Sequence, residues 1–308
     1  MTDPKLRIPA SGFGGSGYKN PVTGEKVPGV TTVLSVIDKP GIVQWHIDNT
    51  AAYAVASVDQ LLSRTEEEGY RFLRYYTKRF KPKDFDNPAI DIHDYSTGVL
   101  NDLAELGDLV HEYIEADLND WFEPDLFRDE QAQMVEQYLI WKSEHDIEVA
   151  CTEATLFGSG YAGTADWIGK IDGVWTMVDN KTSRSTWDEQ KAQLAALGAC
   201  DTWMREVPAG TPGAFKHERT SKGVKATSWW VPTEVPPIQQ YAILHLRPDD
   251  YDNDGNFVPA FCELKVIPQE EIDVAYEMFE GALTIRHAQS RLKAMAKARG
   301  EKEESDDE

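Results

Sequence analysis

The segment from Gly163 to Ser183 constrains the fold more than any other part of the sequence. It reads GTADWIGKIDGVWTMVDNKTS, two apolar runs of strand character on either side of Asp172-Gly173. Asp-Gly favours a tight hairpin turn, so the two runs are expected to pair as adjacent strands. Asp166 lies within the first run and Asp179 near the end of the second. Charged residues inside an apolar strand are costly without partners, so this hairpin predicts a polar site.

Side-chain alternation along a strand adds a cation to the predicted site. Residues two apart point to the same face, so Lys181 should lie beside Asp179, while Asn180 offers its main-chain carbonyl. Two carboxylates and one carbonyl are hard oxygen ligands of the kind that Mg²⁺ binds. Lys181 would orient the attacking water or stabilise charge on a scissile phosphate. The alternative is that Asp166 and Asp179 are surface acids beside turns.

Local composition and hydrophobic periodicity divide the chain into four parts. Residues 1–29 are rich in Gly, Pro and Lys without periodicity, which predicts a flexible N-terminal arm. Apolar residues recur at helical spacing through residues 30–146. Strand-like runs begin near residue 147, and residues 147–299 are expected to form the core domain with a C-terminal helix. Residues 300–308 are an acidic tail, expected to be disordered. The prediction is an α/β fold, a mixed sheet flanked by helices.

Composition excludes several classes of protein. The three cysteines Cys151, Cys200 and Cys262 are widely spaced and never in a CxxC pair, so we expect buried thiols rather than disulfides or a thiolate cluster. No apolar run approaches the length needed to cross a bilayer, and the N-terminus lacks a secretory signal. A cytosolic protein without a membrane partner is expected.

The motif resembles that of a known nuclease family. Gly163-x-x-Asp166, a hairpin, Asp179-x-Lys181-Thr and a following helix that carries Gln are similar to the RecB-like branch of the PD-(D/E)xK nucleases, in particular to exonucleases of actinobacterial phages. GVTTVLSVIDKPGIVQW, starting at Gly29, resembles their N-terminal signature, so the similarity spans most of residues 30–290. It implies a restriction-endonuclease-like core and a metal-dependent DNA exonuclease. Such an enzyme would serve phage recombination, repair or replication in the cytoplasm of an infected bacterium.

The resemblance implies further metal ligands. The family carries Gly-x-x-x-His on a helix before the sheet, which matches Gly107 and His111 here, and its histidine joins the metal site. One or two Mg²⁺ or Mn²⁺ ions are implied, since an imidazole suits Mn²⁺ at least as well as Mg²⁺. Glu153, on the preceding strand, is a further candidate ligand, with an edge-strand acid as the alternative. The iron–sulfur cluster of a related branch needs four cysteines and is not carried over.

The helix after the hairpin matches the family only in part. The family's Gln-x-x-x-Tyr element packs behind the lysine and contacts DNA. Gln193 fits the glutamine and is expected to support Lys181 or the DNA, but Leu197 stands where tyrosine is expected. Gln190, one turn earlier, is the competing candidate.

DNA binding has to be reconciled with a formal net charge of −22, because DNA affinity comes largely from Lys and Arg. Two local basic segments, residues 70–83 and 215–230, interleave cations with aromatic residues. The alternatives are a solvated face of an amphipathic helix and an exposed loop before a core strand. The candidate DNA-binding residues are Arg71, Arg74, Lys78, Arg79, Lys222 and Lys225.

The expected partner is DNA, as linear duplex or single-stranded ends, together with a phage single-strand annealing protein if the resemblance extends that far. Two other functions stay open at this point. One is a catalytically silent nuclease fold that serves as a DNA-binding or recombination scaffold. The other is a metal-dependent enzyme acting on nucleotides or small phosphoesters, which would have no need of the basic segment at 70–83.

Overall fold

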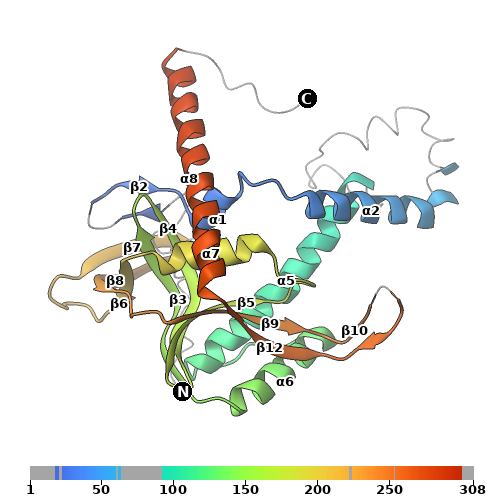
Figure 1. Cartoon of the computed structure of the whole chain (residues 1–308), viewed down its shortest axis with the longest axis horizontal. Helices are drawn as coiled ribbons and strands as arrows, with labels where there is room; N and C mark the ends of the chain where they lie inside the picture. The colour runs from blue at the N-terminus through green and yellow to red at the C-terminus, as the bar shows by residue number, and fades with distance from the viewer. Residues whose placement is uncertain are drawn as a thin grey trace. The chain divides into compact units, whose positions relative to one another are not determined.

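The computed structural model describes residues 18–20, 23–59, 62–63, 92–221, 224–252 and 254–299 (Figure 1). The chain divides into two compact units. One consists of Met1–Ile37 together with Leu109–Glu308, and the other of Asp38–Asp108. The first holds the sheet and all the residues predicted for the metal site.

An eight-stranded mixed sheet forms the first unit, in the order β12-β9-β5-β4-β3-β6-β8-β7. Every neighbouring pair is antiparallel except β5 and β9, which run parallel. The α/β class and the mixed sheet predicted from the sequence are confirmed. The strands are β3 (Ile147–Gly158), β4 (Tyr161–Ile171), β5 (Val174–Lys181), β6 (Thr202–Glu206), β7 (Phe215–Ser221), β8 (Val224–Glu234), β9 (Gln240–Arg247) and β12 (Phe261–Ile267).

The hairpin between β4 and β5 closes through a two-residue turn. Ile171 pairs with Val174, and the two residues between them, Asp172 and Gly173, have φ angles of 52° and 82°. Two consecutive positive φ angles define the turn whose twist matches that of a hairpin. Asp172 also accepts hydrogen bonds from the Asp146 amide at 2.9 Å and from the His145 ring at 2.8 Å.

These bonds predict a pH-dependent stability. The hydrogen bonds from His145 and Asp146 hold the pKa of Asp172 below its ordinary value of 3.8. A carboxyl group whose pKa is lowered in the folded state stabilises the fold at pH values above its ordinary pKa. That stabilisation is lost as the pH falls through the lowered pKa of the folded state. Asp172→Asn keeps the turn but removes the charge. Its melting temperature should lie below that of the wild type at about pH 6 and approach it below about pH 3. A difference that stays constant across this range would contradict the assignment.

Three helices cover one face of the sheet: α1 (Val30–Leu34), α7 (Asp188–Gly198) and α8 (Gln269–Ala298). Their apolar side chains form one core cluster with inward residues of the strands, including Val33, Leu194, Phe279, Met177 and Ile243. Burial of this cluster, rather than helix propensity, is what stabilises the three helices on the sheet.

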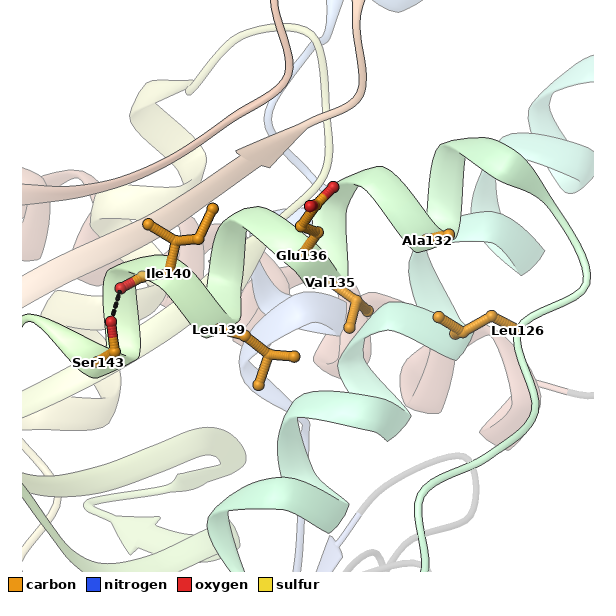
Figure 2. Close-up of a pocket in the computed structure, with 7 residues that line it drawn as sticks. All are labelled: Leu126, Ala132, Val135, Glu136, Leu139, Ile140 and Ser143. Carbon is orange, nitrogen blue, oxygen red and sulfur yellow. Dashed lines mark hydrogen bonds between the residues drawn. The ribbon is translucent and has the colours of Figure 1, made fainter.

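Helix α6 (Asp129–Ser143) covers the opposite face. It packs on β9 and β12. Ile243 of β9 points to the α7 side, and its two neighbours Ala242 and Leu244, which point to the α6 side, are also fully buried. Side chains alternate faces along a strand, so α6 and α8 lie on opposite sides of the sheet (Figure 1). The outer side of α6 carries an apolar groove (Figure 2).

The unit boundaries differ from those predicted. Residues 30–37 and 109–146 belong with the sheet rather than with a separate helical region, because Val33, Val110 and Ile114 are fully buried. Within residues 1–29, the described part is not a free arm. It forms a small hairpin of β1 (Tyr18–Lys19) and β2 (Lys26–Val27), packed through Val27 against the sheet. The predicted tail, 300–308, lies outside the described residues.

In the second unit, the described elements are α2 (Pro40–Ala56) and the first part of α5 (Ile92–Leu118), which continues into the first unit. The His46 ring and the Ser96 hydroxyl are 2.9 Å apart. Two further short strands, β10 (Asp250–Tyr251) and β11 (Phe257–Val258), pair in a hairpin of the first unit.

The three cysteines are free thiols, with Cys200 buried and the other two half-buried. Burial raises the pKa of each to about 12, so they are inert at neutral pH. No helix in the described ranges is long and apolar enough to cross a membrane.

Candidate functional site

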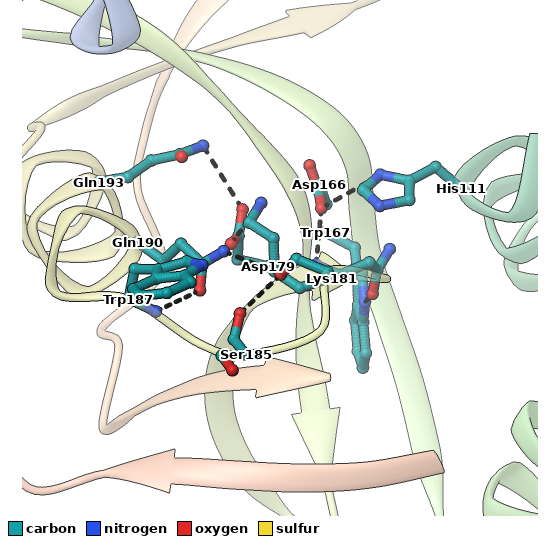
Figure 3. Close-up of polar contacts among 11 residues, drawn as sticks. His111, Asp166, Trp167, Asp179, Lys181, Ser185, Trp187, Gln190 and Gln193 are labelled. Atoms are coloured by element: carbon teal, nitrogen blue, oxygen red, sulfur yellow. Dashed lines mark hydrogen bonds and ion pairs between the residues drawn. The ribbon is translucent and has the colours of Figure 1, made fainter. Parts of the chain in front are cut away.

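Asp166 lies where strands β4 and β5 part. Their ladder runs from the turn to the pair Trp167 and Val178. Beyond that pair, the main-chain N–H of Asn180 donates to Asp166 Oδ2 at 2.7 Å (Figure 3). The Asp166 carboxylate thus accepts a hydrogen bond from a main-chain N–H of β5 that no longer pairs with β4. A buried N–H needs such a partner. We call the place where β4 and β5 diverge, beyond the pair Trp167 and Val178, the fork. The Asp166 side chain at the fork is 16% exposed, so it is mostly covered but still accessible.

Asp179 and Lys181 lie on the same face of β5, as the alternation predicts. The Lys181 ammonium is 2.6 Å from Asp179 Oδ2, and the two side chains are 20% and 2% exposed. Gln193 of α7 donates from Nε2 to the other oxygen, Asp179 Oδ1, at 3.4 Å. The Asn180 side chain points to the opposite face, where its Oδ1 accepts from Trp167 Nε1 at 3.2 Å.

His111 of α5 reaches the same fork. Its Nδ1 atom lies 3.6 Å from Asp166 Oδ2, and the ring is 30% exposed. In Figure 3, His111 approaches Asp166 from one side and Gln193 approaches Asp179 from the other. The structure therefore brings together five residues predicted from the sequence: His111, Asp166, Asp179, Lys181 and Gln193.

The backbone of both strands is irregular at Glu153 and Asp166. The β3–β4 register pairs the residues on either side of Glu153 with those on either side of Asp166, so the two acids are opposite each other. Glu153 has a φ of 46°, a conformation that costs a residue other than glycine about 1 kcal/mol or more. In β4, Ala165 and Ile168 both belong to the core on the α7 side of the sheet. Residues three apart in a regular strand point to opposite faces, so the alternation of side chains shifts by one residue around Asp166. Strain of this kind, next to buried acids, is typical of a functional site.

The electrostatics of the fork favour an added positive charge. Burial raises the pKa of Asp179 to about 6; the Asp166 carboxylate raises it as well, and the Lys181 ammonium acts in the opposite direction. Burial alone would lower the pKa of Lys181, but Asp179 and Asp166 outweigh it and raise that pKa. Two carboxylates this close repel each other as anions, and one ammonium compensates only part of their charge.

The donor set fits a divalent cation. Asp166 and Asp179 offer carboxylate oxygens and His111 offers a ring nitrogen, a combination suited to Mg²⁺ or Mn²⁺. Asp179 Oδ2 is buried and accepts no hydrogen bond of regular geometry within the described part of the chain. In the ranges described, no three His, Cys, Asp or Glu side chains already enclose a metal position. The Lys181 ammonium stands at Asp179 Oδ2, so ion binding there would require Lys181 to shift.

The structure separates the two candidate glutamines. Gln190 Oε1 accepts from the Trp187 main-chain N–H at 3.0 Å, which caps the start of α7, whereas Gln193 reaches Asp179. Leu197, at the position where the family has tyrosine, is 1% exposed in the core. A Cβ atom on Gly163 of β4 would lie 2.7 Å from the Cδ2 atom of Leu197. Position 197 therefore faces the sheet, and Leu197 is a core residue.

Sequence reasoning missed two residues that fix the loop after Lys181. His245 and Arg247 of β9 contact the Ser183 carbonyl at 2.7 Å and the Thr182 carbonyl at 3.1 Å. Burial lowers the pKa of His245, so the neutral ring donates from Nε2 to Ser183 and accepts at Nδ1 from Lys265, 2.9 Å away. The signal was present in QYAILHLR, where His and Arg stand two apart in an otherwise apolar strand.

The structure does not describe the side chains of the predicted DNA-binding residues. Arg71, Arg74, Lys78, Arg79 and Lys222 lie outside the described residues, and Lys225 lies in β8 with its side chain outside them. Their role stays a prediction.

No protein-family model matches the chain, and a search of curated proteins finds no significant match to it. The geometry of the β4–β5 fork is therefore the observation that bears most directly on function.

Proposed function

We propose that this chain is a metal-dependent deoxyribonuclease of the PD-(D/E)xK class, with a RecB-like site. The observation that carries the proposal is the arrangement at the fork. Asp166 and Asp179 lie on diverging strands, with the Lys181 ammonium 2.6 Å from Asp179 and His111 3.6 Å from Asp166. Two acids and a lysine in this order on a hairpin are what phosphodiester hydrolysis of this class requires.

Asp166 and Asp179 would hold one or two Mg²⁺ or Mn²⁺ ions, with His111, the Asn180 carbonyl and Glu153 as further candidate ligands. When bound, such an ion supplies Lewis-acid polarisation of a phosphate oxygen and lowers the pKa of a nearby water. The other catalytic roles fall to side chains of the protein. Lys181 stabilises negative charge that grows on the phosphate or orients the attacking water.

Gln193 positions the Asp179 carboxylate through the bond to Oδ1, and the His245–Arg247 pair holds the loop that follows Lys181. The resemblance to phage exonucleases favours trimming of linear duplex or single-stranded ends during recombination, repair or replication. A single-strand annealing protein would then receive the product strand.

The direct test incubates purified protein with end-labelled linear duplex and with closed circular duplex, in Mg²⁺, Mn²⁺ or EDTA. Degradation of linear DNA that EDTA abolishes would support the nuclease, and intact circles would support the exonuclease mode. DNA that is bound but never cleaved in either metal would support the scaffold instead. Hydrolysis of a small phosphodiester without action on long DNA would favour an enzyme for small substrates.

The two glutamines of α7 offer a matched pair of variants. Gln193→Ala removes the bond to Asp179 Oδ1, and we expect a loss of about tenfold in the cleavage rate, since residues that orient metal ligands typically contribute 10–100-fold. Gln190→Ala removes the cap of α7 and a 3.4 Å bond to the Ser183 hydroxyl, but no contact with Asp166 or Asp179. It should lower the free energy of unfolding by about 1 kcal/mol and reduce cleavage less than Gln193→Ala does. Rates and chemical melts of both variants check this, and equal rates in the two would contradict the role of Gln193.

A further inference from the structure

Two exposed apolar surfaces of the sheet unit lack a partner among the described residues, and they complement each other. The first is the α6 groove, a hollow of about 450 Å³ on the outer side of α6 (Figure 2). It is lined by Leu126, Ala132, Val135, Glu136, Leu139 and Ile140, with Ser143 at its end. Leu139 and Ile140 are 39% and 48% exposed, and Phe127, next in sequence to the groove residue Leu126, is 82% exposed. An apolar hollow with exposed aromatics beside it is typical of an interaction site.

The second surface is the distal half of α8. The buried residues of this helix end at Ala282, and none from Leu283 to Arg299 is buried. Ile285, Leu292 and Met295 are 51%, 65% and 55% exposed. Their spacing of seven and three residues places them on one side of the helix, which we call the α8 stripe. An amphipathic helix that leaves the core with its apolar side exposed is the form that a groove accepts.

The charges of the two surfaces are opposite. Residues 281–299 contain five Lys or Arg and no acid. Residues 120–136, which lead into and form the first half of α6, contain six acids and a single Arg. Opposite charge on two matching apolar surfaces steers association and fixes its orientation.

The dimensions also agree. The sixteen residues from Leu283 to Ala298 form about 24 Å of helix, and the α6 residues that line the groove, from Ala132 to Ser143, span about 17 Å. The two surfaces lie on opposite faces of the sheet, since α8 packs with α7 on one face and α6 covers the other. The distal half of α8 therefore cannot reach the groove of its own chain.

We infer that the distal half of α8 of one chain docks in the α6 groove of a second copy of this chain. The contact joins two different surfaces, so it is head-to-tail, and its repetition builds a ring or an open filament rather than a simple two-fold dimer. Leu292 and its neighbours in the stripe fill the hollow, and the Lys and Arg residues beside them meet Glu136 of the groove and the acids that precede it in residues 120–130. The inference does not depend on the proposed nuclease activity.

The test is the mass of the full-length protein in solution, measured by sedimentation velocity over about 1–100 µM, the range in which a modest interface associates. The wild type should form species larger than a dimer, and high salt should weaken them, since the charged contacts are screened. Leu292→Glu should weaken association by about tenfold or more, because it places a charge in an apolar contact. A wild type that stays monomeric throughout overturns the inference.

A matched control separates the apolar contact from the change of charge. Ala294 is exposed on the other side of α8, about 200° around the helix from Leu292. Ala294→Glu introduces the same charge and should leave association within about twofold of the wild type, since its side chain points away from the groove. Equal effects of Ala294→Glu and Leu292→Glu would overturn the inference. Circular dichroism melts verify that both variants fold.

Mixing two variants tests the head-to-tail arrangement. Leu139→Glu spoils the groove but leaves the α8 stripe intact, and Leu292→Glu does the reverse. Each variant alone should remain largely monomeric at concentrations where the wild type assembles. A mixture should form a one-to-one dimer and nothing larger, because only one intact groove and one intact stripe can meet. A mixture that stays monomeric, or a Leu139→Glu chain that still assembles, would overturn the inference.

Discussion

Lys181→Ala is expected to lower the rate of metal-dependent DNA cleavage by about 10²–10³-fold, the usual loss when a group that stabilises transition-state charge is removed. The Lys181 ammonium is 2.6 Å from Asp179 Oδ2, and Asp179 and Asp166 both raise the pKa of Lys181, so the side chain stays positively charged at the fork. Initial rates on end-labelled linear duplex in saturating Mg²⁺ or Mn²⁺ measure the loss.

Two controls make this result interpretable. Lys191 of α7 forms ion pairs with Glu271 and Asp188 outside the fork, and Lys191→Ala should cleave DNA at nearly the wild-type rate. Lys181→Ala also leaves Asp179 buried without its cation, which destabilises a fold by about 3–5 kcal/mol when nothing compensates. Lys181→Gln, which keeps a polar group there, tests whether folding explains the loss. Cleavage at the wild-type rate by either Lys181 variant would contradict the proposed mechanism.

Phe279→Ala is expected to lower the free energy of unfolding by about 3–5 kcal/mol, the usual effect of emptying a large apolar site in a core. Phe279 is fully buried in the cluster that joins α8 to the sheet. Its ring lies 4.7 Å from that of Tyr161 in β4 and 6.3 Å from that of Tyr276 in α8. Equilibrium urea denaturation followed by circular dichroism measures the change.

Val274→Ala serves as the control on the same helix. Val274 is 65% exposed, and its loss should change the free energy of unfolding by less than about 0.5 kcal/mol. If the two variants were destabilised equally, α8 would not be held to the sheet through Phe279.

The candidate site was largely predictable because its signals are local. The Asp-Gly turn, the two apolar runs and the alternation of side chains place Asp179 beside Lys181 without any knowledge of distant residues. Gln193 and His111 were predicted from the resemblance, and the structure places both within reach of the two acids. The choice between Gln190 and Gln193 could not be made from sequence, because both lie near the start of one helix and differ only in what faces them.

The sequence alone determined β3, β4 and β5, the hairpin turn and the chemistry available at the end of β5, since these depend on neighbours a few residues apart. Only the tertiary structure decided that β4 and β5 part at Asp166, that Glu153 lies opposite it in a strained conformation, and that His245 and Arg247 hold the loop after Lys181. These features depend on contacts between segments up to 65 residues apart in the sequence. Packing of the whole sheet, rather than any local preference, brings them together.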